Sequence, residues 1–142
     1  WSSDVCSSDL LFGALISFST GSSWGVWSIM MPIAFPMAVA FDISIPFVVG
    51  AVIGGGLFGD QCSPISDTTV LSSTGASCNH IVHVMTQIPY GITVGISAFV
   101  GFLFGGLTGQ YVLSIAVTAA ILTVSLITLT QLTKRRYPEK VH

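Results

Sequence analysis

The sequence has almost no charge. Only 7% of its 142 residues are charged, compared with about 25% in an average soluble domain. Between Leu10 and Thr133 there is no Lys, Arg or Glu, and the only acids are Asp42, Asp60 and Asp67. A soluble domain of this size needs more charge to cover its surface, so the ordinary soluble classes are excluded. With an apolar fraction of 51%, the sequence predicts an integral membrane protein.

Cysteines and basic residues are also few, and their positions exclude several kinds of site. Cys6, Cys62 and Cys78 form no Cys-x-x-Cys pair, so a zinc ribbon or a redox motif is not supported. Small buried residues are a better interpretation of these cysteines than a disulfide between Cys62 and Cys78. Basic patches with interleaved aromatic residues are missing, so we expect no nucleic-acid partner.

The two ends of the chain differ from its middle. Residues 1–10 are serine-rich, repeat Ser-Ser-Asp and lack the basic segment of a signal peptide. We interpret them as a non-native N-terminal scar and exclude them from the expected fold. Residues 11–133 form the expected transmembrane part. Residues 134–142 carry all four Lys and Arg residues, and the positive-inside rule makes them a cytoplasmic tail.

The C-terminal half contains two uninterrupted apolar stretches. Residues 88–107 and 111–132 each match the roughly 20 residues that cross a bilayer core. The short link between them predicts an antiparallel hairpin. Small residues spaced four apart allow helices to pack closely in lipid, and two such pairs occur in the first stretch: Gly91 with Gly95, and Gly101 with Gly105.

The N-terminal half is interrupted. We expect apolar helices over 10–18, 24–41 and 45–58, separated by polar breaks at 19–23 and 59–67. A further short helix over residues 70–83 should end before the proline at 89. Unwound backbone at membrane depth is tolerated only in protein or a water-filled cavity. Short, interrupted apolar segments therefore indicate a transporter binding site.

The second break contains Asp60, an acid in an otherwise apolar region of the sequence. A charged side chain at the bilayer centre costs about 2.5–3.5 kcal/mol even on lenient insertion scales, so an acid there indicates a functional site. A half-helix over 46–58 would direct its negative dipole end at Asp60. Burial and this dipole both disfavour the carboxylate, and the same negative field attracts a cation. Asp60 is therefore expected to hold either a proton or a metal ion.

The remainder of the break supplies neutral oxygens. Pro64 prevents a continuous helix, and Ser66 or Asp67 fits the N-cap of the next helix. Asp67 is thus either an ion ligand or only a cap. Hard cations prefer oxygen ligands, and the expected set for transported Na⁺ or H⁺ comprises Asp60, Asp67, Ser63, Ser66, Thr68 and Thr69, with Thr20 and Ser22 from the first break.

Three other polar residues have simpler interpretations. Asp42 lies between two apolar stretches and fits a solvated turn at the membrane surface. His80 and His83 stand three apart, a spacing that allows metal binding on a helix. Because a third ligand of suitable spacing is missing, interfacial histidines are the better account, and pH sensing remains an alternative.

The break itself resembles a known family. Residues 59–76, beginning Gly-Asp-Gln-Cys-Ser-Pro-Ile-Ser-Asp-Thr-Thr, closely resemble the signature of NhaC-type Na⁺/H⁺ antiporters. Residues 79–84 and 86–90 look like its continuation, and 18–25 are similar to its Thr-Gly-Thr-Ser-Trp-Gly element. At Val82 close relatives would carry an acid, which this chain lacks.

The resemblance implies a bacterial inner-membrane carrier that exchanges Na⁺ for H⁺ and is not an enzyme. It implies an all-α fold with discontinuous or re-entrant helices, of which this chain forms the C-terminal half of an inverted repeat. The expected partners are the lipid bilayer and the missing N-terminal half of the same carrier, and a homodimer is compatible. No cofactor is expected beyond the transported Na⁺ and H⁺.

Two alternatives remain open. An ion-coupled exchanger of organic acids or amino acids would use the helix N-terminus near Thr68 to hold a substrate carboxylate. An intramembrane aspartyl protease would use two acids sharing a proton. The protease is remote, because no second acid lies on a separate full-length span and Gly56–Asp60 only loosely matches a Gly-x-Gly-Asp motif.

Overall fold

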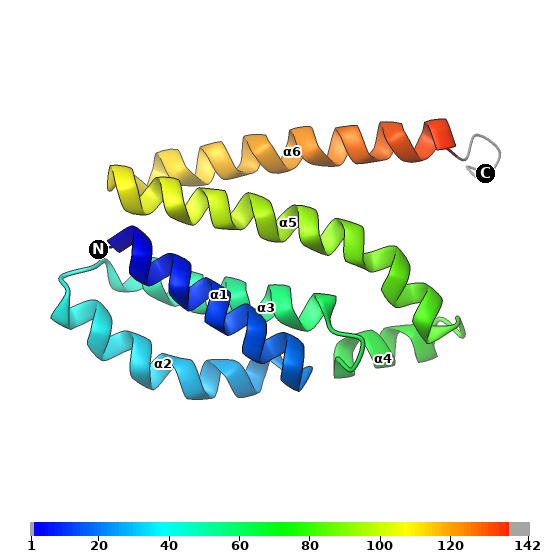
Figure 1. The fold of residues 1–142 in the computed structure, drawn as a ribbon, viewed down its shortest axis with the longest axis horizontal. Helices are drawn as coiled ribbons and strands as arrows, with labels where there is room; N and C mark the ends of the chain where they lie inside the picture. Colours follow the sequence, from blue (N-terminus) through cyan, green and yellow to red (C-terminus); the bar gives the residue numbers. More distant parts are fainter. Residues whose placement is uncertain (1, 137–142) are drawn as a thin grey trace.

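The computed structural model describes residues 2–136, and the regular structure in this part is all helical. The end of the expected cytoplasmic tail, including Lys140, lies outside the described residues. The helices follow one another as drawn in Figure 1: α1 (Ser2–Thr20), α2 (Ser23–Ala40), α3 (Ile45–Cys62), α4 (Asp67–Gly75), α5 (His80–Thr108) and α6 (Tyr111–Arg136).

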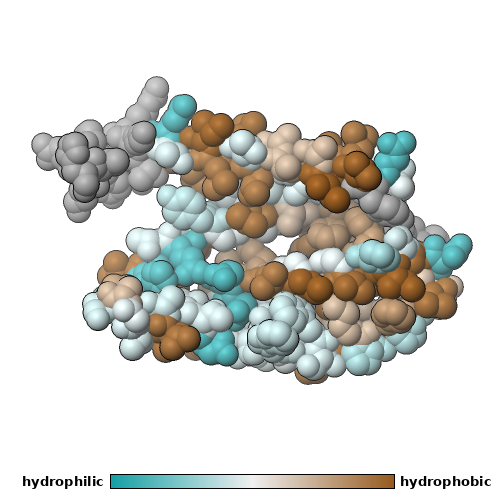
Figure 2. All heavy atoms as spheres, turned by 180° about the vertical axis from the view of Figure 1, so that it is seen from behind, coloured by the Kyte–Doolittle hydropathy of each residue, from teal (hydrophilic) through white to brown (hydrophobic). Residues whose placement is uncertain are grey.

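Four helices of the described part are long and apolar enough to cross a membrane, namely α2, α3, α5 and residues 112–131 of α6. This confirms the predicted all-α integral membrane class. Exposed apolar side chains cover much of the surface, and Figure 2 shows them along α6 and the middle of the molecule. Hydrophilic residues gather instead at the end where α4 and the start of α5 lie.

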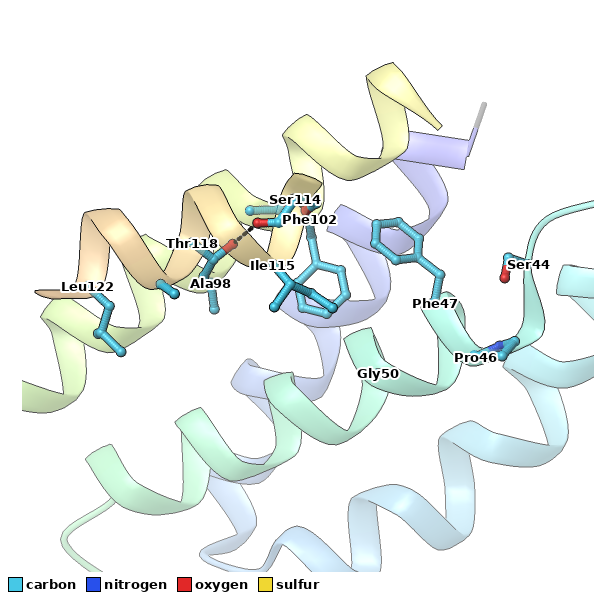
Figure 3. A pocket seen from close by; sticks show the side chains of 12 residues that line it. Ser44, Pro46, Phe47, Gly50, Ala98, Phe102, Ser114, Ile115, Thr118 and Leu122 are labelled. Carbon is cyan, nitrogen blue, oxygen red and sulfur yellow. Dashed lines mark hydrogen bonds between the residues drawn. The ribbon is translucent and has the colours of Figure 1, made fainter. Parts of the chain in front are cut away.

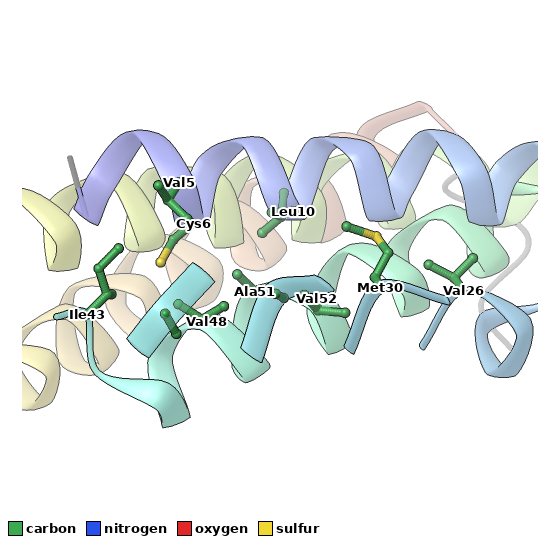
Figure 4. Close-up of a cluster of buried hydrophobic side chains, with 11 residues drawn as sticks. Val5, Cys6, Leu10, Val26, Met30, Ile43, Val48, Ala51 and Val52 are labelled. Atoms are coloured by element: carbon green, nitrogen blue, oxygen red, sulfur yellow. The ribbon is translucent and has the colours of Figure 1, made fainter. Parts of the chain in front are cut away.

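The N-terminal segment is part of the fold, although we excluded it on its composition. Residues 2–10 continue α1, and Val5, Cys6 and Leu10 are buried. They pack with side chains of α2 and α3 in the main apolar cluster (Figure 4). Serines do not prevent a helix when its apolar positions face a partner, because tertiary packing outweighs propensity. The expected helix over 10–18 therefore begins eight residues earlier.

Close contact between α1 and α3 depends on glycines of α3. A Cβ at Gly55 would collide with the backbone carbonyl of Leu10, and one at Gly59 would collide with that of Ala14. The Ser17 hydroxyl donates to the Gly56 carbonyl at 2.6 Å and ties the same two helices together. Small residues spaced four apart thus bring two backbones together, as they do in membrane helix pairs.

The predicted C-terminal hairpin is confirmed. Gly109 ends α5 with φ 65°, a left-handed conformation that favours glycine, and α6 returns along α5. The two expected glycine pairs lie at close contacts: Gly101 and Gly105 face Thr118 and Ser114 of α6, whereas Gly91 and Gly95 face Cys62 and Phe58 of α3. Between α3, α5 and α6 lies an apolar pocket of about 660 Å³, with Phe47 and Phe102 in its wall (Figure 3).

Two predicted helix boundaries were wrong. Helix α3 does not stop at residue 58 but continues to Cys62, so Asp60 lies in its last turn. The expected helix over 70–83 is divided, because a turn with Ser77 at φ 51° separates α4 from α5. Helix α5 then runs through Pro89 and bends in its N-terminal third (Figure 1). Membrane helices tolerate an internal proline in this way.

The glycine contact yields a stability prediction. Gly55→Ala places a methyl group against the Leu10 carbonyl, and overpacking of this kind costs about 1–3 kcal/mol. Gly25→Ala is the matched control, since nothing lies within 4 Å of its Cβ position. Thermal unfolding of the full-length protein in detergent should show a lowered Tm for the first variant only. Equal melting temperatures would mean that α1 and α3 are not held by this contact.

Candidate functional site

The two helix breaks lie against each other. The amide of Asp67 donates to the carbonyl of Gly21 at 3.4 Å, and the Ser63 hydroxyl donates to the carbonyl of Phe18 at 2.8 Å. Gly21 has φ +68°, and a Cβ there would lie 2.7 Å from the carbonyl oxygen of Ile65. The break between α1 and α2 therefore needs glycine both for its backbone conformation and for this close approach.

Asp60 is buried at the junction of α3 and α4. Its side chain is only 2% exposed, although it belongs to the last turn of α3. One carboxyl oxygen, Oδ1, accepts a hydrogen bond from Ser66 Oγ at 2.8 Å. The other, Oδ2, accepts one from Thr68 Oγ1 at 3.3 Å. Each oxygen thus has a neutral hydroxyl partner from the beginning of α4.

The local sequence explains this arrangement. Pro64 cannot continue α3, and Ser66 starts α4 as its N-cap, accepting from the amide of Thr69 at 3.4 Å. The same hydroxyl that caps α4 therefore donates its hydrogen to the end of α3. Thr68 Oγ1 lies 2.8 Å from Ser66 Oγ, which completes a ring of three polar side chains.

This ring satisfies both protonation states of Asp60. With the carboxylate ionised, the hydroxyls of Ser66 and Thr68 each donate to one of its oxygens. With the carboxyl protonated, its hydrogen goes to Thr68, Thr68 donates to Ser66, and Ser66 donates to Oδ1. Because hydroxyl hydrogens rotate freely, no heavy atom needs to move. The site can accept and release a proton without leaving a buried polar group unsatisfied.

The two acids have different environments. Asp67 is exposed, and its Oδ1 accepts from the amide of Thr68 at 2.8 Å in the first turn of α4. Ser66, not Asp67, is the N-cap. A negative charge at this position is favourable to the helix. Asp67 therefore stabilises the first turn of its own helix, and its carboxylate does not join the ring around Asp60.

The other expected ligands are not gathered around Asp60. The Thr20 side chain is exposed and donates to the carbonyl of Ile16 at 2.9 Å, within its own helix. Ser22 is half-buried at the N-cap of α2 and makes no capping bond with its side chain. Ser63 is fully buried, but its hydroxyl donates to α1. Thr69 is 3% exposed, and its hydroxyl has no hydrogen-bond partner among the described residues.

The structure also assigns contacts to both histidines. His80 Nε2 donates to the carbonyl of Pro64 at 2.7 Å, and its Nδ1 lies 3.1 Å from Ser73 Oγ. His83 Nε2 lies 3.2 Å from Ser72 Oγ. Both rings therefore connect the start of α5 to α4. His80 also binds the segment between α3 and α4 through the Pro64 carbonyl. The i, i+3 spacing indicated a shared face, but it did not indicate these partners.

A cavity of about 390 Å³, lined by residues of polar type, adjoins the ring around Asp60. We call it the Gln87 cavity; it is lined by Gln61, Thr68, Thr69, Ser72, His83 and Gln87. Sequence reasoning missed both glutamines as members of a site. The available signal was the hydrophilic composition of residues 61–87, whose one charged residue is Asp67, in an otherwise apolar chain. Figure 2 shows a hydrophilic end of the molecule.

Comparison with known proteins identifies the family. The sequence profile of the Na⁺/H⁺ antiporter family matches residues 8–107, which includes both breaks and the ring around Asp60. The chain belongs to the Na⁺/H⁺ antiporter family. This confirms the resemblance noted in the sequence. Membership indicates a transporter rather than an enzyme, and the intramembrane aspartyl protease is set aside.

Several curated relatives match this chain. An uncharacterized protein of Haemophilus influenzae is 48% identical over 80% of the chain. The malate-2H⁺/Na⁺-lactate antiporter of Bacillus subtilis is 33% identical over 68%. An uncharacterized Na⁺/H⁺ antiporter of Haemophilus influenzae is 35% identical over 68%. The chain spans 21–22% of the length of these relatives. No solved structure matches it significantly.

The double role of Ser66 yields a second prediction. Ser66→Ala removes an N-cap and a donor to a buried carboxylate, which together cost about 2–4 kcal/mol. Asn79→Ala is the matched control, because Asn79 caps α5 through the amides of Ile81 and Val82 and contacts no carboxylate; it should cost about 1 kcal/mol. Thermal unfolding of the full-length protein checks the difference. Equal losses of stability in the two variants would show that the hydrogen bond from Ser66 to Asp60 adds nothing to the free energy of unfolding.

Proposed function

We propose that this chain carries the ion-exchanging centre of a Na⁺/H⁺ antiporter, with Asp60 binding H⁺ and Na⁺ alternately. The observation that carries the proposal is the burial of Asp60 between two neutral hydroxyls at the junction of α3 and α4. Membership of the Na⁺/H⁺ antiporter family supports the same reaction.

Competition at one carboxylate couples the two fluxes. Na⁺ binding needs the ionised carboxylate, so the ion enters only after the proton leaves, and the reverse holds for the return step. No group of three or more His, Cys, Asp or Glu residues gathers in the described part of the chain. The ring therefore offers one negative charge with neutral oxygens, a donor set that suits a hard monovalent cation better than zinc.

The membrane setting follows from the same proposal. We place the junction of α3 and α4 at membrane depth, as a discontinuous or re-entrant element of an inverted-repeat carrier in the bacterial inner membrane, with the C-terminus cytoplasmic. The second half of the carrier and the lipid bilayer would surround the exposed apolar faces of α5 and α6. A homodimer is compatible with these faces.

A second candidate function is exchange of an organic acid coupled to the same ions. It is favoured by the similarity to the malate-2H⁺/Na⁺-lactate antiporter, which is 33% identical over 68% of the chain. In that case Asp60 would still exchange H⁺ and Na⁺, and an organic anion would be carried in addition. Adding malate and lactate to the transport assay separates the two candidates.

Transport provides the third prediction. In everted vesicles containing the full-length carrier, Asp60→Asn should reduce Na⁺-dependent proton movement to background, because an amide carries no charge and releases no proton. Asp67→Asn is the matched control, and it should retain most of the exchange because Asp67 is exposed and contacts its own helix. Full exchange by Asp60→Asn would rule out the mechanism.

A further inference from the structure

The break between α3 and α4 leaves the Gln61 carbonyl without an amide from its own segment. In a continued helix this carbonyl would accept from the amide of residue 65, or from that of residue 64 in a tighter turn. Pro64 has no amide hydrogen, and the amide of Ile65 donates to Ser63 Oγ at 3.4 Å. The Gln61 carbonyl therefore needs a donor from elsewhere in the chain.

The carbonyl of Pro64 is in the same situation. Its two local candidates are the amides of Asp67 and Thr68, three and four residues further on. The Asp67 amide donates to the Gly21 carbonyl at 3.4 Å, and the Thr68 amide donates to Asp67 Oδ1 at 2.8 Å. Backbone at the proposed membrane depth has to find its partners in protein or in a water-filled cavity. This carbonyl also needs a donor from outside the break.

Helix α5 supplies both donors. Gln87 Nε2 donates to the Gln61 carbonyl at 3.1 Å and also to Gln61 Oε1. His80 Nε2 donates to the Pro64 carbonyl at 2.7 Å. His80 and Gln87 stand seven residues apart, which is two helical turns and places them on one face of α5. This face therefore holds the chain at the end of α3 and again just before α4.

The ring of His80 is fixed at both nitrogens. Because the Pro64 carbonyl can only accept, Nε2 must carry a hydrogen. Nδ1 lies 3.1 Å from the hydroxyl of Ser73 on α4, which is buried, and a hydroxyl can donate to this nitrogen or accept from it. The Nε2 hydrogen is present in the neutral tautomer and in the protonated ring alike. The bond to Pro64 therefore requires no particular charge on His80.

Both bonds lie next to the exchange centre. Gln61 directly follows Asp60, and Pro64 lies two residues before Ser66, whose hydroxyl donates to Asp60 Oδ1 at 2.8 Å. A displacement of either carbonyl would move the hydroxyls of Ser66 and Thr68 relative to the carboxyl group. Since a hydroxyl has to lie within about 3 Å of an oxygen to donate to it, a small shift of the break is enough to open the ring.

We propose that His80 and Gln87 are positioning residues of the exchange centre. By holding the two carbonyls of the break, they keep the hydroxyls of the ring on the carboxyl group of Asp60. Each acts through the backbone of the break rather than through the ion. The inference rests on the proposed Na⁺/H⁺ exchange at Asp60, and it assigns the start of α5 as the element that sets the geometry of that site (Figure 1).

The test separates positioning from folding through the kinetics of exchange. Na⁺-dependent proton movement by the full-length carrier is measured in everted vesicles over a range of Na⁺ concentrations at constant ionic strength. A loss of folded protein lowers only the maximal rate, whereas a displaced ring weakens Na⁺ binding and raises KM. His80→Leu should raise the KM for Na⁺ about tenfold, the factor that one hydrogen bond of ordinary strength supplies. Gln87→Met should produce a rise of similar size.

A conservative variant and a matched control complete the test. The side-chain amide of Gln places its nitrogen at a reach similar to that of His Nε2. His80→Gln should therefore return the KM for Na⁺ to the wild-type value and leave the pH profile of exchange unchanged. Thr86→Val is the matched control on α5, because the exposed Thr86 side chain donates to the His83 carbonyl within its own helix. It should leave KM unchanged.

The outcomes for positioning and for exchange are distinguishable. A wild-type KM in either His80→Leu or Gln87→Met, with exchange abolished in Asp60→Asn, overturns the positioning role and leaves the exchange at Asp60 standing. A raised KM and a shifted pH profile in His80→Gln also overturn it, because the charge of the ring would then matter and not its bond to Pro64. If His80→Leu does not fold, the KM of Gln87→Met decides alone. Failure of the proposed exchange would show instead as full transport by Asp60→Asn.

Discussion

The hydrogen bond from Ser66 to Asp60 is the interaction on which the site depends. This bond of 2.8 Å links Ser66, the N-cap residue of α4, to Asp60 in the last turn of α3. Ser66 caps α4 with the same hydroxyl oxygen, so the start of one helix and the solvation of a buried acid depend on one side chain. This link also brings Thr68 to the second carboxyl oxygen.

This junction is held in place by the packing of α1 against α3. Glycines of α3 allow the two backbones to touch, and the hydroxyls of Ser17 and Ser63 cross between the helices. The Ser63 hydroxyl donates to the carbonyl of Phe18, close to the end of α1. The chain turns after α1 at Gly21, which lies in close contact with Ile65. The first break therefore serves as a backbone support for the second. Its hydroxyl side chains do not surround Asp60.

The sequence predicted the break and its acid, but not the directions of the side chains. Pro64 and the cost of a buried carboxylate singled out Asp60 as a candidate. Of the expected hydroxyls, the structure places those of Ser66 and Thr68 on its carboxyl oxygens. Thr20 was expected at the site, yet a threonine in a helix readily donates to the carbonyl four residues back, and it does so here. That choice between local and tertiary partners is invisible in a list of residue types.

Other features were out of reach because they depend on packing between distant segments. Residues 2–10 were left out of the expected fold because of their composition. A helix needs only a few apolar positions that face a partner, and Val5, Cys6 and Leu10 supply them. Gln61 and Gln87 lie 26 residues apart and meet only because α5 returns beside the end of α3. Periodicity gives no sign of such a contact.

The shortage of basic residues, which first indicated a membrane protein, also suits the chemistry at Asp60. A Lys or Arg beside a buried carboxylate would favour its ionised form and oppose proton binding, and it would repel an incoming cation. No Lys or Arg occurs between Leu10 and Thr133, and the partners of Asp60 are two hydroxyls. Hydroxyls donate to the carboxylate, accept from the carboxylic acid, and present lone pairs to a metal ion. Under the proposed exchange, a neutral shell of this kind would keep the proton and the cation in competition for one charge.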